Sequence, residues 1–251
     1  AYQQKVPETL IVLTTDHGKT SRRITLPIAQ LYHVAVDNDV PYRVYTNMQD
    51  NGTMRGLSTT PEIAPGTVIG ASRGGGGWIS MTAPAGLWDH GIGGCESGFT
   101  IPDPTDSNII WATCYGNEVT RYDHRTRLAR SVSPWFRTLD SPPNTIKWRA
   151  HWTPPLAIDP FDHNTVYYGT QYIHKTTDGG SSWTVISPDL STADPRYIIS
   201  SGGIVGDNLG QFYGCVVFAI APSPIQKGLV WAGTNDGKVW LTRNDGGSWE
   251  D

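Results

Sequence analysis

The sequence predicts an all-β fold in which short strands recur in a repeated unit. Three observations lead to this prediction. No window of about a dozen residues carries an apolar stripe at helical spacing without a Gly or Pro interrupting it. Gly and Pro are frequent, at 28 and 18 residues, and show no collagen-like period, which indicates many turns. A strand, turn, strand pattern also returns along the chain.

The clearest strands are short segments rich in β-branched and aromatic residues. Ten Trp and eleven Tyr residues supply apolar bulk that a disordered chain lacks, so we expect a packed core. The predicted strands are 10–13, 33–36, 43–45, 109–113, 119–122, 166–169, 173–176, 216–220, 229–232 and 239–242.

The clearest repeated turn is residues 176–183, with the sequence TTDGGSSW. Asp178 can accept hydrogen bonds from backbone amides ahead of it, and Gly180 can adopt a positive φ. Trp183 then opens the next strand as a large apolar side chain. Related turns lie at 14–21 (TTDHGKTS) and 242–249 (TRNDGGSW).

A second repeated element is a polar Asp-Pro turn that precedes an apolar strand. It is clearest in IPDPTDSNIIWA and IDPFDHNTVYYG, and its equivalent positions are 37, 103, 159 and 221. The repeat is therefore about 60 residues long, with some four short strands in each unit. A unit of this kind is typical of a β-propeller blade.

We therefore predict one β-propeller region over residues 1–251, with four-stranded blades. The blades are anchored near 37, 103 and 159, and partial blades occupy 1–30 and 221–251. The chain begins and ends at the same phase of the repeat, whereas propellers close rings of about 4 to 8 blades. We expect an incomplete part of a larger propeller, completed by other segments or chains.

The turns at 176–183 and 242–249 resemble the Asp-box, or bacterial neuraminidase repeat, with the pattern Ser/Thr-x-Asp-x-Gly-x-Thr/Ser-Trp. The first fits fully, the second has Asn244 for the Asp, and 14–21 has Ser21 for the Trp. Together with VYYG, VWAGTNDG and MQDNG, these turns resemble bacterial secreted sortilin-like propellers, often named glycosyl-hydrolase repeat proteins.

The resemblance implies that the boxes are structural, lie at the periphery of the blades, and belong to a secreted or periplasmic bacterial protein. It assigns no catalytic residue, because enzymes and receptors share the motif. The structural box residues would be Asp16, Gly18, Asp178, Gly180, Trp183, Asn244, Gly246 and Trp249.

Charge and composition exclude several classes of protein. A net charge of −4 with only 19 Lys and Arg residues leaves no basic field for a nucleic acid partner. No apolar run approaches the length of a membrane span. Cys95, Cys114 and Cys215 lack a zinc spacing. One pair with a free thiol is an alternative, but three small buried apolar side chains is the preferred interpretation.

Acidic residues in the irregular loops are the candidates for catalysis. Asp50, Glu96 and Asp207 could supply the two carboxylates that glycoside hydrolysis requires, although Asp50 also suits a hairpin turn. No cofactor is predicted, apart from Ca²⁺ near Asp37 and Asp39, where a solvated turn is the preferred alternative.

Aromatic residues outside the boxes are the candidates for binding a protein or a glycan, with filling of gaps between blades as the alternative. We prefer a non-catalytic propeller that binds a protein or a glycan or serves as a structural assembly module. The alternative is a glycoside hydrolase of the xyloglucanase or sialidase kind. The binding candidates are Trp78, Trp88, Trp135, Trp148 and Trp152.

Overall fold

The computed structural model describes residues 11–13, 22–24, 29–59, 72–73, 79–80, 88–136, 143–198 and 214–251. Its main architecture is four consecutive antiparallel sheets, each formed by strands that follow one another in the chain. These sheets are the blades of a β-propeller, so the predicted fold class is confirmed. Each predicted strand overlaps a strand of the structure.

Three of the blades have four strands, and the fourth blade has three. Leu241 in the last strand also pairs with Glu250, which begins the edge of the fourth sheet. The first blade is β3 (Leu31–Val36), β4 (Arg43–Met48), β5 (Gly52–Leu57) and β8 (Trp88–His90). The second is β9 (Thr100–Pro102), β10 (Ile109–Cys114), β11 (Glu118–Asp123) and β12 (Leu128–Ser131). The third is β13 (Leu156–Ile158), β14 (Val166–Gly169), β15 (Ile173–Thr176) and β16 (Thr184–Val185). The fourth is β17 (Val217–Pro222), β18 (Val230–Thr234) and β19 (Val239–Thr242).

Two short strand pairs and one helical turn complete the described elements. The pairs are β1 (Ile11–Leu13) with β2 (Arg22–Ile24), and β6 (Ser72–Arg73) with β7 (Ile79–Ser80). The helical turn is η1 (Pro143–Thr145), which lies in the connection between the second and third blades. No helix in the described part of the chain has the length and apolar character needed to cross a membrane.

The predicted Asp-Pro turns connect the first and second strands of the blades. The backbone amide of Asp103 donates to the carbonyl of Ile109, and Asp159 makes the same bond to Thr165. In the fourth blade the equivalent amide is that of Ser223, two residues after the expected position. The Asp side chains accept amides ahead of them, which explains why Asp recurs in these turns.

The core consists of apolar clusters between consecutive blades. Tyr45 packs with Ile110 between the first and second blades, and Trp111 packs with Leu156 between the second and third. Tyr167 packs with Val217 and Val230 between the third and fourth. These aromatic side chains are buried, and truncating one to Ala is expected to cost about 3 to 5 kcal/mol.

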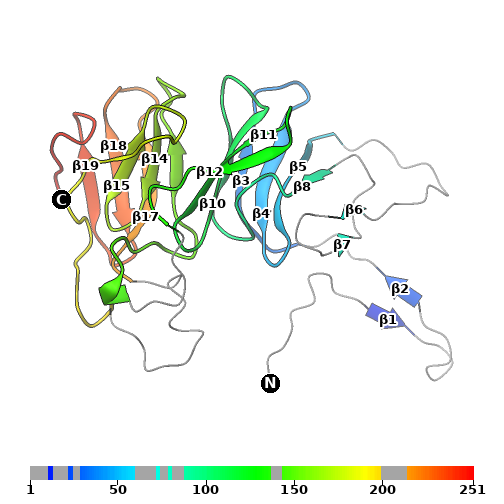
Figure 1. Ribbon diagram of the computed structural model, residues 1–251, viewed down its shortest axis with the longest axis horizontal. Helices are drawn as coiled ribbons and strands as arrows, with labels where there is room; N and C mark the ends of the chain where they lie inside the picture. Colours follow the sequence, from blue (N-terminus) through cyan, green and yellow to red (C-terminus); the bar gives the residue numbers. More distant parts are fainter. Residues whose placement is uncertain are drawn as a thin grey trace.

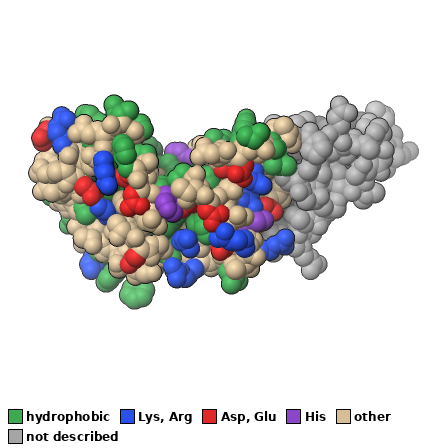
Figure 2. Space-filling view, turned by 90° about the horizontal axis from the view of Figure 1, so that it is seen from above, with side chains coloured by type: hydrophobic (Ala, Val, Ile, Leu, Met, Phe, Trp, Pro, Cys, Tyr) green, Lys and Arg blue, Asp and Glu red, His purple; other side chains and the backbone are tan. Residues whose placement is uncertain are grey.

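Figure 1 shows the blades in a row that follows chain order, with the first and fourth blades at opposite ends. The described blades form an open row instead of a closed ring, as expected for part of a larger propeller. On the face seen in Figure 2, acidic and basic side chains are interspersed, in keeping with the small net charge.

The preferred interpretation of the cysteines was wrong for two of the three. Cys95 and Cys114 form a disulfide, whose Cα atoms are 5.1 Å apart, and Cys215 is a buried free thiol. The sequence separation of 19 residues hides this pairing, because Cys95 lies in a loop that returns to β10 only in the folded chain.

Candidate functional site

One end of the first and second blades brings two of the predicted acidic residues together with a predicted binding Trp. The β4–β5 turn carries Asp50, the loop before β9 carries Glu96, and the connection into β13 carries Trp152. We call this group the Glu96 cluster. Its members are Tyr32, Gln49, Asp50, Glu96, Tyr115 and Trp152.

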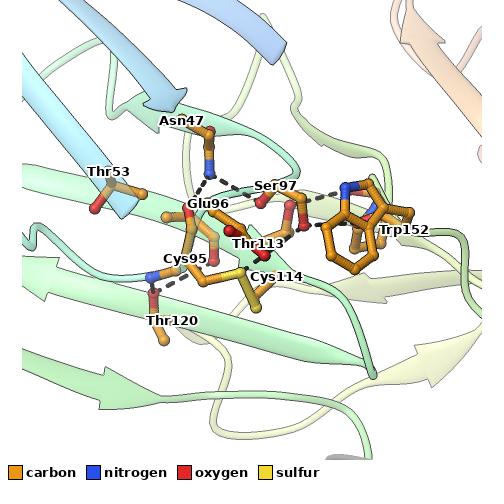
Figure 3. Close-up of a disulfide and its surroundings, with 12 residues drawn as sticks. Asn47, Thr53, Cys95, Glu96, Ser97, Thr113, Cys114, Thr120 and Trp152 are labelled. Carbon is orange, nitrogen blue, oxygen red and sulfur yellow. Dashed lines mark hydrogen bonds between the residues drawn. A yellow bond between two sulfur atoms is a disulfide. The ribbon is translucent and has the colours of Figure 1, made fainter. Parts of the chain in front are cut away.

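The loop that carries Glu96 is fixed on both sides of that residue (Figure 3). The side-chain amide of Asn47 donates to the carbonyl of Cys95 at 2.8 Å and to that of Ser97 at 2.9 Å. Cys95 is tied to β10 by the disulfide, and the hydroxyl of Ser97 donates to the carbonyl of Trp152 at 2.7 Å. Because these anchors lie on the two neighbours of Glu96, they fix the position of the backbone that carries its carboxyl group.

Glu96 accepts two hydrogen bonds from the β4–β5 turn. The backbone amide of Asp50 lies 2.7 Å from Oε2 of Glu96, and Nε2 of Gln49 lies 3.0 Å from the same oxygen. Burial raises the pKa of Glu96, and the neighbouring Asp50 carboxylate adds to the rise, although the Asp50 amide opposes it. Glu96 therefore holds its proton more readily than an ordinary glutamate does.

A directed chain of hydrogen bonds links Trp152 to Glu96. Trp152 Nε1 donates to the hydroxyl of Tyr32 at 2.7 Å, and that hydroxyl donates to Oε1 of the Gln49 side chain. An indole N–H can only donate, so the Tyr32 hydroxyl accepts from Trp152 and donates to Oε1 of Gln49. The Nε2 group of Gln49 then faces the carboxyl groups of Asp50 and Glu96. Burial raises the pKa of Tyr32, so its hydroxyl stays protonated.

An aromatic pair lies beside this chain. The rings of Tyr115 and Trp152 are stacked, with centroids 4.4 Å apart and an interplanar angle of 10°. Both side chains are half-buried, so part of each reaches solvent. Aromatic surface beside a carboxyl group and a side-chain amide can contact the apolar face of a ligand while bonding to its polar groups.

The carboxyl groups of Asp50 and Glu96 share one hydrogen-bond donor. Glycoside hydrolases separate the two groups by about 5 to 10 Å, which leaves room for the scissile bond or a water. Here Gln49 Nε2 lies 3.0 Å from an oxygen of each carboxyl group.

Of the other predicted aromatic residues, the three that the structure describes do not join the Glu96 cluster. The Trp135 and Trp148 rings meet edge to face at 5.2 Å, with Lys147 Nζ 3.9 Å from the Trp135 centroid. Trp88 lies over Gly56, where an added Cβ would come within 2.3 Å of the indole, so it fills space on the sheet. Trp78 and Asp207 are outside the described residues, as are Asp16 and Gly18.

The turns at 176–183 and 242–249 share one set of hydrogen bonds. Asp178 accepts the amide of Ser182 at 2.9 Å, and Asn244 accepts that of Ser248 at 2.9 Å. The bonds from Ser182 lower the pKa of Asp178 to about 2. These turns leave β15 and β19 at the opposite end from the β14–β15 and β18–β19 turns, so they do not contribute to the Glu96 cluster.

The indoles of these turns pack on the preceding blade. Trp183 Nε1 donates to the carbonyl of Val132 at 2.6 Å, and Trp249 Nε1 donates to that of Ile186 at 2.8 Å. Gly180 and Gly246 lie so close to the same two residues that a Cβ would collide with them. Each turn therefore joins its own blade to the one before it.

The acidic residues considered for Ca²⁺ have protein partners. Asp37 accepts hydrogen bonds from Tyr45 and from Arg43, and Asp39 is paired with Arg43 and Ser107. Within the described ranges, no group of three or more His, Cys, Asp or Glu side chains is arranged to hold a metal ion.

Three members of the Glu96 cluster were missed by sequence reasoning: Tyr32, Gln49 and Tyr115. Gln49 is adjacent to the candidate Asp50, so a wider look at that turn could have found it, and Tyr115 directly follows Cys114. Tyr32 offers no such signal, because it meets Trp152 across 120 residues of sequence.

The fold and this site define the chain as a β-propeller segment with a fixed polar and aromatic cluster at one end. No family model matches the sequence, and no curated protein matches it either. Several solved structures show similarity to the chain. A structure described as YCF48 bound to D1 peptide shares 18% identity, with a TM-score of 0.32, over 58% of this chain and 37% of that one.

Two others are enzymes by their descriptions. An ancestral GH74 enzyme is 16% identical, with a TM-score of 0.45, over 90% of this chain and 31% of its own. The GH74 xyloglucanase from Xanthomonas campestris is 14% identical, with a TM-score of 0.41, over 97% of this chain and 42% of its own. The chain thus spans less than half of each of these three structures, and no residue role is transferred from them.

Proposed function

We propose that the chain is a non-catalytic β-propeller module that binds a glycan at the Glu96 cluster. The observation that carries the proposal is the stacked Tyr115 and Trp152 pair beside the bonded carboxyl group of Glu96. An aromatic surface suits the apolar face of a sugar ring, and the carboxyl and amide groups suit its hydroxyls. A loop fixed by a disulfide and by Asn47 loses little conformational entropy on binding.

Calorimetric titration with neutral oligosaccharides, beginning with xyloglucan fragments, tests this proposal. Trp152→Ala is expected to raise Kd by about 10-fold or more, because aromatic anchors dominate such sites. Glu96→Gln preserves the size of the side chain but removes its charge, and it is expected to weaken binding by a smaller factor. Trp88→Phe is the matched control, since Trp88 packs on the same blade away from the cluster.

Saturable binding of neutral glycans that Trp152→Ala weakens and Trp88→Phe leaves unchanged supports the proposal. If the parent protein binds no member of a panel of neutral and sialylated glycans, the glycan proposal fails. Binding only to peptides, with the same dependence on Trp152, would move the proposal to a protein ligand.

A glycoside hydrolase is the second candidate, and one observation favours it. Asp50 and Glu96 lie together, and the pKa of Glu96 is raised as in a general acid. We expect no release of reducing sugar from xyloglucan and no cleavage of sialosides. Hydrolysis that Glu96→Gln abolishes would overturn the non-catalytic proposal.

We also propose that residues 176–183 and 242–249 are Asp-box turns with a structural role. Their shared bonds, with Asn244 in the place of Asp178, and their contacts with the preceding blade support this. The disulfide supports a secreted or periplasmic location, because such bonds persist in oxidising compartments. Further blades, from another segment or chain, would complete the ring.

A further inference from the structure

The connection between the second and third blades holds a second group of aromatic side chains, separate from the Glu96 cluster. It consists of Trp135, Phe136, Lys147 and Trp148, and we call it the Trp135 cage. Trp135 and Phe136 follow β12, whereas Lys147 and Trp148 follow η1. Trp135 and Trp148 were predicted as binding residues from the sequence, and the proposed glycan site uses neither of them.

The three rings of the cage are set at angles to one another. The Trp135 and Trp148 rings meet edge to face, with centroids 5.2 Å apart and an interplanar angle of 65°. Phe136 meets Trp135 in the same manner, with centroids 5.4 Å apart and an angle of 61°. Rings at such angles present their π faces in more than one direction, which is the arrangement that can surround a cation.

A cation already contacts two of these faces. The ammonium group of Lys147 lies 3.9 Å from the centroid of the Trp135 ring and 4.6 Å from that of the Trp148 ring. Both distances are well within about 6 Å, the range in which the quadrupole of a ring attracts a cation. Lys238, by comparison, lies 6.0 Å from the centroid of the Trp240 ring. The two indoles of the cage therefore form a cation site that the chain fills with its own side chain.

The protein fixes Trp148 and the backbone of Lys147 through contacts that do not involve the Lys147 side chain. The Trp148 ring packs against the buried His174, with centroids 4.5 Å apart, and the Trp148 carbonyl accepts the side-chain amide of Asn117 at 2.8 Å. The carbonyl of Lys147 accepts the side-chain amide of Gln171 at 3.0 Å. The exposed side chain of Lys147 can therefore swing away from the rings while the backbone keeps its place.

We propose that the Trp135 cage binds a quaternary ammonium group, and that Lys147 is the intramolecular occupant that the ligand displaces. A primary ammonium is a compact, strongly hydrated charge, so the exposed Lys147 side chain returns to water at small cost. A trimethylammonium group carries its charge on methyl groups, loses water more readily and contacts several rings at once. Trp135 and Phe136 are 37% and 79% exposed, so the cage is open to such a ligand.

Calorimetric titration with choline tests the inference. The unaltered chain is expected to bind choline saturably, and Lys147→Ala should lower the Kd by about 3-fold or more, because it removes the competing ammonium. Trp135→Leu keeps apolar bulk but removes the indole face, and it should raise the Kd by about 10-fold or more. Lys238→Ala is the matched control, because Lys238 lies over Trp240 and not in the cage, and it should leave the Kd unchanged.

The neutral carbon isostere of choline, dimethylbutanol, separates recognition of a cation from apolar binding. It should bind at least about 10-fold more weakly than choline. Equal affinities for the two, no saturable binding of choline by Lys147→Ala, or a Lys147→Ala variant that binds choline no more tightly than the unaltered chain would each overturn the inference.

Two further titrations identify the source of the ligand and keep the two proposed sites apart. A short peptide containing trimethyllysine is compared with choline, and the tighter binder shows whether the ammonium group belongs to a protein side chain or to a free amine. Trp152→Ala should retain choline binding, and Trp135→Leu should retain glycan binding. Either site can therefore fail its test while the other stands.

Discussion

Replacing Asn47 by Ala is expected to lower the free energy of unfolding by about 4 kcal/mol and to abolish ligand binding at the Glu96 cluster. The side chain of Asn47 is fully buried, and its amide nitrogen donates to the carbonyls of Cys95 and Ser97. Its oxygen accepts the hydroxyl of Thr100 at 2.7 Å. The substitution leaves these three groups buried without their partner, and each orphaned group costs about 1 to 3 kcal/mol.

Chemical denaturation measured alongside glycan titration checks this prediction. Asn164→Ala is the matched control, because the Asn164 amide bonds only within an exposed surface turn, and its loss is expected to cost about 0.5 kcal/mol or less. A variant at Asn47 that is as stable as the control would contradict the role assigned to this residue. Full stability with lost binding would indicate that Asn47 positions Glu96 without stabilising the fold.

The blades could be predicted because their strands and turns have local signals. β10 and β14 are continuous apolar segments after Asp-Pro turns, β18 follows a Pro-rich turn in the same place, and the turns at 176–183 and 242–249 repeat nearly residue for residue. β5 was missed, since its sequence GTMRGL contains two Gly residues. Gly56 is required there by the close packing of Trp88, so tertiary structure overrides β propensity in this strand.

The site could be predicted only in part, because its geometry depends on contacts between distant segments. Asp50 and Glu96 were candidates from loop position alone, but at a sequence separation of 46 nothing indicated that the Asp50 amide bonds to Glu96. The disulfide that fixes the Glu96 loop was equally hidden. The contacts between irregular loops could not be predicted, because these loops are not part of the repeated sequence pattern.

The box turns show how a repeated motif can be predicted while its physical role is not. From sequence, Trp183 is a side chain that opens the next strand of its own blade. In the structure it donates to Val132 of the preceding blade, and Trp249 donates to Ile186 in the same way. In the third and fourth blades the motif therefore supplies a contact to the preceding blade.

Lowering the pH from 7 to about 4 is expected to cost about 3 kcal/mol of stability through His174 alone. Burial lowers the pKa of His174 from 6.5 to about 3, and Lys147 acts in the same direction. Its Nε2 bonds to Thr170 at 2.8 Å, whereas its Nδ1 is buried without a hydrogen-bond partner in the described structure. At pH values between about 3 and 6.5, His174 binds a proton in the unfolded chain but not in the folded chain, so acidification favours unfolding.

The stability contributed by His174 depends on pH in a different way from that contributed by the carboxyl groups. Stability is fully present above pH 6.5 and falls as the pH drops towards the folded pKa of about 3. Asp residues with lowered pKa values, such as Asp37 and Asp103, lose their contribution only below the ordinary aspartate pKa of 3.8. Glu96, with its raised pKa, acts in the opposite direction and gains relative stability on acidification.

Urea denaturation of His174→Gln across this pH range measures the contribution. Glutamine can keep the bond to Thr170 but does not titrate, so the variant should lose much of the pH slope between pH 6.5 and about 4. His124→Gln is the control, because His124 is only half-buried and lies on the second blade, away from His174. An unchanged slope in His174→Gln would mean that His174 is protonated in the folded protein, and that the space between Trp148 and Tyr168 admits water to its ring.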